Sequence, residues 1–209
     1  ERRAQQALLK AASKVSTARE QAAVQLSQAI TAAMQGLGMA GGRFEARLVP
    51  LPEPQAHGME NVEFLVAGHP GSTPRPVGKV ASGGELSRII LEIEVVLAET
   101  QQAPTFIFDE VDAGVGGAAA IEVGRRLAIL AQRAQVIVVT HLAQVAAYAN
   151  AHLRVLKTSS TEFTATDVVS LNQSARIEEL ARMLSGLSDS ESGLAHAAEL
   201  RERALAEFA

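Results

Sequence analysis

The segment Thr105-Phe106-Ile107-Phe108-Asp109-Glu110 decides the fold class, because a short apolar run is followed directly by two acidic residues. Such a run is typical of a strand that is covered on both faces, as the strands of a parallel sheet are. A second run, Val136-Ile137-Val138-Val139, ends in Thr140-His141, and a helical pattern separates the two runs. Strands that alternate with helices predict an α/β fold, with a mostly parallel sheet and flanking helices.

The segments around these two runs predict the other elements. Residues 1–37 are rich in Ala, Gln, Leu and Arg and predict one long helix that ends at Gly36-Leu37-Gly38. Its apolar stripe leaves both the end of a coiled coil and an amphipathic surface helix open. Further helices are expected over 85–100, 117–132, 142–149, 175–184 and 191–208, and further strands over 43–51, 61–67, 153–157 and 163–171. The prolines at 50, 52 and 54 are expected to end the first of these strands, and residues 68–78 to form a loop.

Composition excludes several classes of function. The 209 residues are 47% hydrophobic and 20% charged, which is enough apolar material for a buried core. Only 3% are aromatic, which argues against a base-stacking nucleic-acid platform, and the net charge of −4 excludes a strongly basic DNA-wrapping domain. The absence of cysteine excludes disulfides, cysteine-ligated zinc, iron–sulfur clusters and thiol catalysis.

The sequence contains no evident targeting or membrane segment. The N-terminus lacks the apolar core of a signal peptide, and the uncharged stretches 21–42 and 134–153 are too polar to span a bilayer. The chain begins without Met and inside a helical pattern, so we expect it to be a piece of a longer protein.

The two acidic residues after the first apolar run are candidates for nucleotide chemistry. In an open α/β sheet, Asp109 and Glu110 would lie at the carboxyl edge, where ligands bind. One carboxylate can hold Mg²⁺, usually through water, while the other orients an attacking water. His141 ends the second run at the same edge and could donate a hydrogen bond to a phosphate oxygen. Two acids in a solvated turn and a capping histidine are the simpler interpretations.

A second candidate site is Ser82-Gly83-Gly84-Glu85, where a loop enters a helix. Ser82 and Glu85 have the spacing of a capping box, which is a sufficient reason for those two residues. Gly83 and Gly84 would bare backbone N–H groups at the positive end of the helix dipole, which is a site for an anion such as phosphate. Asp112 lies in a Gly-rich turn that follows the two acidic residues.

The order of these features resembles the second half of an ABC-type ATPase head, preceded by a coiled-coil helix. Ser82 to Glu85 look like the signature motif, and Phe106 to Glu110 look like Walker B with the catalytic glutamate. Residues 109–117, Asp-Glu-Val-Asp-Ala-Gly-Val-Gly-Gly, resemble the SMC-like branch of this class. Within that branch the chain is similar to the bacterial RecN family, which acts in repair of DNA double-strand breaks. The segments 79–88, 139–146 and 177–184 support the likeness.

This resemblance implies a role for each candidate. Asp109 would hold Mg²⁺, Glu110 would be the general base, and His141 would contact the γ-phosphate of ATP. The signature residues 82–85 would bind ATP held by a second protomer, and Asp112, at the D-loop, would lie across that dimer interface. The implied partners are the protein's own N-terminal P-loop segment, a second copy and DNA, in the bacterial cytoplasm and on the nucleoid after DNA damage. Residues 1–20, with five basic and two acidic residues, offer a weak DNA-binding candidate that a solvated helix face would also explain.

The sequence has no Walker A motif, which needs the pattern G-x-x-x-x-G-K-[ST]. The segment 71–79 has the wrong spacing, and Val80 stands where the hydroxyl residue should be. The resemblance implies that 1–37 are the end of a coiled-coil arm and that 38–209 are the C-terminal lobe of the head. The fragment alone is expected to be inactive, because hydrolysis would need the P-loop segment and head dimerisation.

Two other classes remain as alternatives. Residues 114–119 match G-x-G-x-x-A, as in dinucleotide-binding oxidoreductases. However, five residues separate Phe108 from Gly114, and the next strand ends in Thr140-His141 without an acidic residue for a ribose. The other alternative is a structural coiled-coil or adaptor module with a vestigial nucleotide site. Within the ABC class, SMC-type condensins and RecF-like loaders are neighbours.

Overall fold

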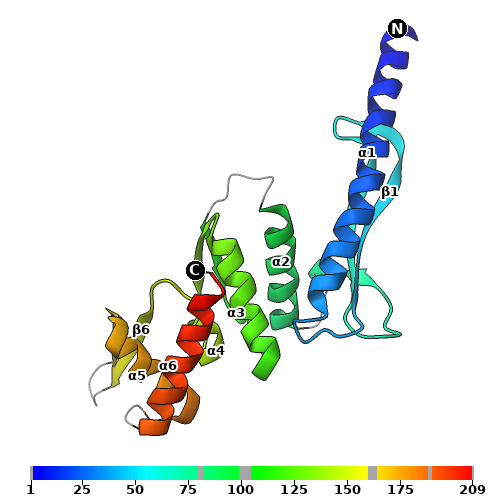
Figure 1. Ribbon diagram of the computed structural model, residues 1–209. Coiled ribbons are helices and arrows are strands. Elements are labelled where there is room, and N and C mark those ends of the chain that lie inside the picture. The colour runs from blue at the N-terminus through cyan, green and yellow to red at the C-terminus, as the bar shows by residue number, and fades with distance from the viewer. Residues whose placement is uncertain (1, 80–81, 99–104, 160–163, 188–189, 209) are drawn as a thin grey trace. The chain divides into compact units, whose positions relative to one another are not determined.

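The computed structural model divides the chain into two compact units, Glu1–Gln102 and Ala103–Ala209 (Figure 1). It describes residues 2–79, 82–98, 105–159, 164–187 and 190–208. Each unit has its own secondary structure and buried residues. Within the described part of the chain, every helix is too short or too polar to cross a membrane.

The first unit combines a long helix with an antiparallel sheet. Its elements are α1 (Arg2–Met34), β1 (Arg43–Gln55), β2 (Gly58–Ala67), β3 (Arg75–Pro76), a 3₁₀ turn η1 (Val77–Lys79) and α2 (Gly83–Leu97). The strand order is β1-β2-β3, and both pairings are antiparallel. The C-terminal part of α1 is buried against the sheet, with Ile30 and Met34 fully covered.

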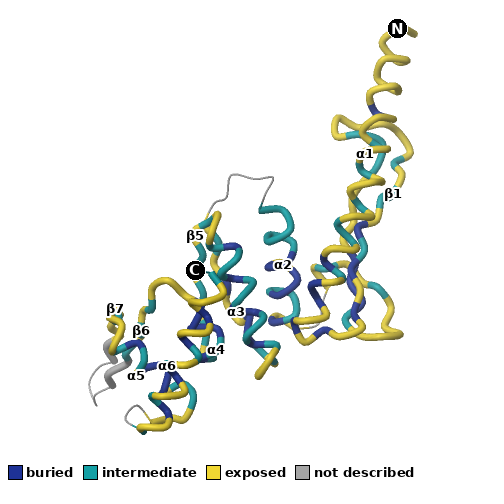
Figure 2. The backbone as a smooth tube through the Cα atoms, in the orientation of Figure 1, coloured by how far each residue is buried: buried dark blue, intermediate teal, exposed yellow. Residues whose placement is uncertain are grey.

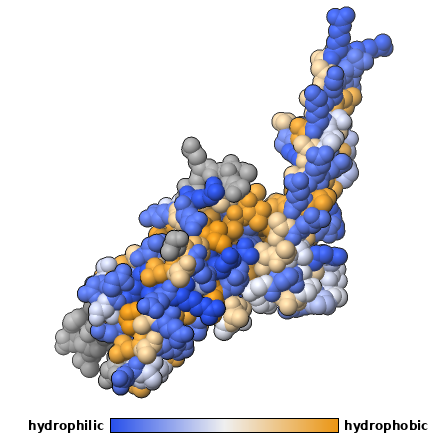
Figure 3. Space-filling model, viewed as in Figure 1, coloured by the Kyte–Doolittle hydropathy of each residue, from blue (hydrophilic) through white to orange (hydrophobic). Residues whose placement is uncertain are grey.

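The N-terminal part of α1 is exposed over residues 2–11, as its yellow colour in Figure 2 shows. Figure 3 shows hydrophilic residues over most of this part, with apolar residues between them. Among the apolar ones, Leu8 is 54% exposed and Leu9 is 46% exposed. The expected helix is confirmed, whereas its role as the end of a coiled coil stays a prediction.

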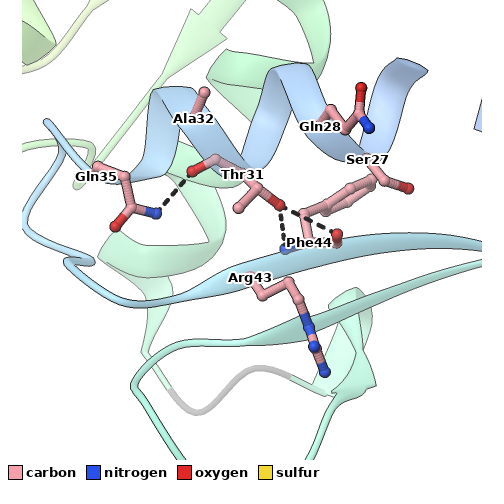
Figure 4. Close-up of a pocket in the computed structure, with 7 residues that line it drawn as sticks. All are labelled: Ser27, Gln28, Thr31, Ala32, Gln35, Arg43 and Phe44. Carbon is pink, nitrogen blue, oxygen red and sulfur yellow. Dashed lines mark hydrogen bonds between the residues drawn. The ribbon is translucent and has the colours of Figure 1, made fainter. Parts of the chain in front are cut away.

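Strand β1 continues through the three prolines that were expected to end it, and it ends at Gln55. The reason is the direction of its N–H groups. Phe44 N donates to Thr31 Oγ1 (3.0 Å; Figure 4) and Ala46 N donates to Ser27 Oγ (2.9 Å), so alternate N–H groups face α1 and not β2. Pro50 shares this alternation and pairs with Glu60. A proline there removes no hydrogen bond of the β1–β2 ladder, because β1 is an edge strand.

The second unit contains the two apolar runs. Strands β4 (Thr105–Phe108) and β5 (Gln135–Val138) are parallel, with Phe108 opposite Val138, and α3 (Gly117–Ala131) connects them. The elements that follow are α4 (Ala143–Ala146), the antiparallel hairpin of β6 (Leu153–Ser159) and β7 (Thr164–Ser170), α5 (Gln173–Ser185) and α6 (Glu191–Ala206). Each expected helix and strand is therefore present within the described residues, with bounds that differ by a few residues, while 99, 100 and 163 lie outside the described residues. The expectation of a loop over 68–78 is wrong at its end, where β3 and the start of η1 lie.

The expectation of a mostly parallel sheet is wrong for the described residues. Only β4 and β5 pair in parallel there, and the other described pairings are antiparallel. Short turns can connect antiparallel strands, whereas a parallel pair needs a crossover such as α3. The apolar runs are also not covered on both faces, because Ile107, Ile137 and Val139 are 71%, 46% and 59% exposed. The opposite face is better covered, and Phe108 is buried there.

Two buried arginines stabilise the C-terminal end of α4. The guanidinium of Arg176, on α5, donates to the backbone oxygens of Ala146, Ala149 and Asn150, and that of Arg201, on α6, donates to Ala147 O. Carbonyls at a helix C-terminus carry partial negative charge and lack partners within the helix, so cations are favourable there. Burial lowers the pKa of Arg176 to about 10 and also lowers the pKa of Arg201. The two arginines therefore fix the short helix that follows His141.

Candidate functional site

The carboxyl ends of β4 and β5 border an open cavity of about 350 Å³. Because the strands are parallel and in register, the residues that follow each one lie at the same edge. The lining residues are Asp109, Glu110, Asp112, Ala113, Val139, Thr140 and His141. The structure thus brings together the Asp109–Glu110 pair, Asp112 and His141, which the sequence singled out as three separate features.

Glu110 has a backbone conformation that is rare for its residue type. Its φ is +57°, and it is the only described non-glycine residue with a positive φ. The turn is held by two hydrogen bonds, from Glu110 N to Asp109 Oδ1 (2.9 Å) and from Ala113 N to Glu110 O (2.9 Å). A side chain in this region costs about 1 kcal/mol or more, and such strain is found preferentially at functional sites. The local backbone therefore places an exposed carboxylate at the mouth of the cavity.

Asp112 is the buried member of the group, with only 3% of its side chain exposed. Its Oδ2 atom accepts hydrogen bonds from Thr140 Oγ1 and from His141 N (3.1 Å), and it lies 3.2 Å from His141 Nδ1. Thr140 Oγ1 in turn accepts from Leu142 N (3.1 Å). The His141 side chain is 73% exposed, so its ring extends from this buried anchor into solvent. Sequence reasoning missed both Thr140 and the inward position of Asp112.

The site fits a magnesium ion only if a bound nucleotide supplies part of its ligands. Among the described residues, no three His, Asp or Glu side chains are grouped closely enough to hold a metal by themselves. Mg²⁺ in nucleotide sites is held by one or two carboxylates together with phosphate oxygens and water. The Asp109 carboxylate at the cavity edge meets that requirement.

The predicted signature segment begins α2, in the first unit. Ser82 is the N-cap, and its Oγ accepts a hydrogen bond from Glu85 N at 3.5 Å. Ser82 and Gly83 are exposed, whereas Gly84 is buried. The capping interpretation is thus confirmed for Ser82, and the phosphate interpretation stays a prediction. These residues and the carboxylates belong to different units.

A larger cavity of about 420 Å³ lies between α1 and β1 (Figure 4). Three of its polar side chains, those of Ser27, Thr31 and Gln35, hold the fold by hydrogen bonds. Thr31 Oγ1 donates to Phe44 O (3.2 Å), and Gln35 Nε2 donates to Thr31 O (2.7 Å) and Gly42 O (3.1 Å). The convergent carboxylates and histidine of the β4–β5 edge are the better candidate site.

Solved structures with a similar fold are heads of SMC proteins. The Smc head domain with a coiled coil and joint from Pyrococcus yayanosii aligns with a TM-score of 0.54 and 22% identity, over 77% of this chain and 29% of that one. The Smc head domain with an extended coiled coil from Pyrococcus furiosus gives a TM-score of 0.50 and 22% identity, over 75% of this chain and 37% of that one. No family model matches the chain. The chain therefore has a fold like that of part of an SMC head domain.

Curated relatives identify the particular family. The DNA repair protein RecN of Streptomyces coelicolor is 48% identical over 202 residues, which cover 91% of this chain and 35% of that protein. RecN of Mycobacterium tuberculosis is 46% identical over 93% of the chain, and RecN of Deinococcus radiodurans is 46% identical over 92%. The chain belongs to the RecN family, and it spans about a third of the length of these relatives.

Proposed function

We propose that the chain forms the C-terminal part of the ATPase head of a DNA repair protein, and that it supplies one half of a composite ATP site. The observation that carries the proposal is the grouping of Asp109, Glu110 and His141 around one cavity at the carboxyl edge of two parallel strands. The order of the sequence motifs and the identity to RecN proteins support the same conclusion.

Each side chain at this edge has a chemical task in phosphoryl transfer. Glu110 would accept a proton from the water that attacks the γ-phosphate, as a general base. Asp109 would hold Mg²⁺, which, when bound, neutralises charge that develops on the phosphate oxygens. His141 would contact the γ-phosphate through its exposed ring. Hydrolysis of this kind depends on positioning and electrostatics more than on covalent chemistry.

The remaining parts of the site would come from other segments. The sequence lacks a Walker A motif, so the P-loop is proposed to lie in the part of the protein that precedes this chain. Ser82, Gly83 and Gly84, at the start of α2, would bind the nucleotide of a second protomer through backbone N–H groups. ATP would then control whether two heads engage on DNA. Support for the P-loop partner comes from the exposed apolar face of Ile107, Ile137 and Val139, which a further segment could cover.

The experiment is Glu110→Gln in the full-length protein. We expect ATP binding to persist and hydrolysis to fall by about 100-fold or more, because the amide keeps the shape of the carboxylate but is no base. The readouts are nucleotide affinity at equilibrium and phosphate release under saturating ATP. Glu53→Gln, at an exposed position on β1, is the matched control and should hydrolyse ATP like the wild type. Normal turnover in Glu110→Gln would refute the role of Glu110 and favour an adaptor with a vestigial site.

A further inference from the structure

The contact between Asp112 and His141 links the two loops that form the candidate site. All contacts of the Asp112 carboxylate described above come from the same chain, and they converge on one oxygen atom. The side chain is 3% exposed, so this carboxylate has almost no surface to offer a second protomer. The carboxylate is therefore placed to interact with Thr140 and His141 of its own chain.

We propose that Asp112 is a positioning residue for His141, within the same protomer. Oδ2 lies 3.2 Å from Nδ1 of the imidazole, and in this proposal it accepts the Nδ1–H and so sets which ring nitrogen carries the proton when His141 is neutral. The ring is then oriented with Nε2 away from the buried anchor and toward the solvent side of the cavity. This inference rests on the proposed contact of His141 with the γ-phosphate.

The arrangement has a consequence for phosphate binding. When the imidazole carries both protons, it donates from Nδ1 to Asp112 and from Nε2 to a phosphate oxygen. The hydrogen bonds from Thr140 Oγ1 and His141 N hold the carboxylate in place, so it can orient the ring without moving. Asp112 thereby acts through His141 and need not touch the nucleotide.

A double-mutant cycle in the full-length protein tests whether the two residues act as a unit. Asp112→Asn keeps the shape and an acceptor for Thr140 but loses the charge. We expect kcat for ATP to fall about 10- to 100-fold with KM changed by less than about threefold. In a His141→Ala background the same substitution should have no further effect on kcat, because its target is gone. Losses that multiply in the double variant would overturn the proposal.

A second readout needs no ATP. In the full-length protein with ¹⁵N-labelled histidine, the His141 signals, assigned by their loss in His141→Ala, should show the proton on Nδ1. Asp112→Ala should redistribute that proton, whereas Thr140→Val, which removes a different donor to the same oxygen, should not. An unchanged ¹⁵N pattern in a folded Asp112→Ala variant would refute the proposal, and if this variant does not fold, the cycle with Asp112→Asn decides. Normal hydrolysis by His141→Ala would instead refute the proposed phosphate contact, while the ¹⁵N pattern would still report on Asp112.

Discussion

The left-handed backbone conformation of Glu110 costs folding free energy, and it places the carboxylate of this residue at the cavity. At a φ of +57°, every residue with a Cβ is strained, whereas glycine is not. We therefore predict that Glu110→Gly raises the free energy of unfolding of the full-length protein by up to about 1 kcal/mol while it abolishes ATP hydrolysis. Glu110→Ala is the matched control, because it removes the same carboxylate and keeps the strain. Denaturant titration measures the free energy of unfolding of both variants. An equal increase in the two variants would contradict the strain argument.

His152 makes stability depend on pH. Burial lowers the pKa of this histidine, and the neighbouring cation of Arg176 lowers it further, while the carboxylate of Glu179 opposes the shift. Near pH 6.5, the ordinary pKa of about 6.5 for histidine, His152 therefore takes up a proton in the unfolded state but stays neutral in the folded state. Above that pH the histidine is neutral in both states, so folding carries no penalty. As the pH falls below it, protonation of the unfolded state lowers the free energy of unfolding. We predict that the thermal midpoint falls between pH 7.5 and 5.5, and that His152→Gln reduces this slope; an identical slope in the variant would contradict the prediction.

At the scale of elements, the close approach of α3 to α4 depends on a glycine. A Cβ on Gly124 would lie 2.6 Å from the Tyr148 ring and 3.0 Å from Gln144 O. Overpacking of this kind costs roughly 1–3 kcal/mol. We predict that Gly124→Ala lowers the free energy of unfolding by that amount, measured by denaturant titration. Gly78→Ala is the control, because no heavy atom lies within 4 Å of the added Cβ, and a similar loss in both variants would show that packing is not the cause.

At the scale of the whole molecule, the exposed face of β4–β5 is the place where the rest of the protein is expected to pack. Ile107 is 71% exposed there, although it lies in a run of apolar residues. If another segment covers this face, a lysine would be buried without a partner. We predict that Ile107→Lys destabilises the full-length protein by roughly 2 kcal/mol or more and lowers ATP turnover.

The matched control for that substitution is Val62→Lys, at a 47% exposed position on β2. It should leave both the thermal midpoint and ATP turnover close to the wild-type values. Equal behaviour of Ile107→Lys and Val62→Lys would indicate that the β4–β5 face faces water in the complete protein.

The sequence allowed most elements and the acidic residues and histidine of the cavity to be predicted, whereas the effect of Pro50 and the contacts of Asp112 could not be predicted. The apolar runs and the caps are local signals, so β4, β5 and the Ser82 cap could be found. The effect of Pro50 depends on which side of the strand its missing N–H would face, and that is set by β2 and α1. The contact of Asp112 with His141 joins residues that are 29 apart in the chain. No local pattern encodes either of these arrangements.

The outer edge of β1 shows how one strand is protected in two ways. Near its start, hydroxyls of Ser27 and Thr31 on α1 receive the outward N–H groups of Ala46 and Phe44. Farther along, prolines at alternate positions supply no N–H at all. An edge with few available donors is a poor template for a strand from another molecule, which is the first step of sheet-mediated aggregation. The β1–β2 hairpin is thereby hindered from joining strands of neighbouring copies into fibres.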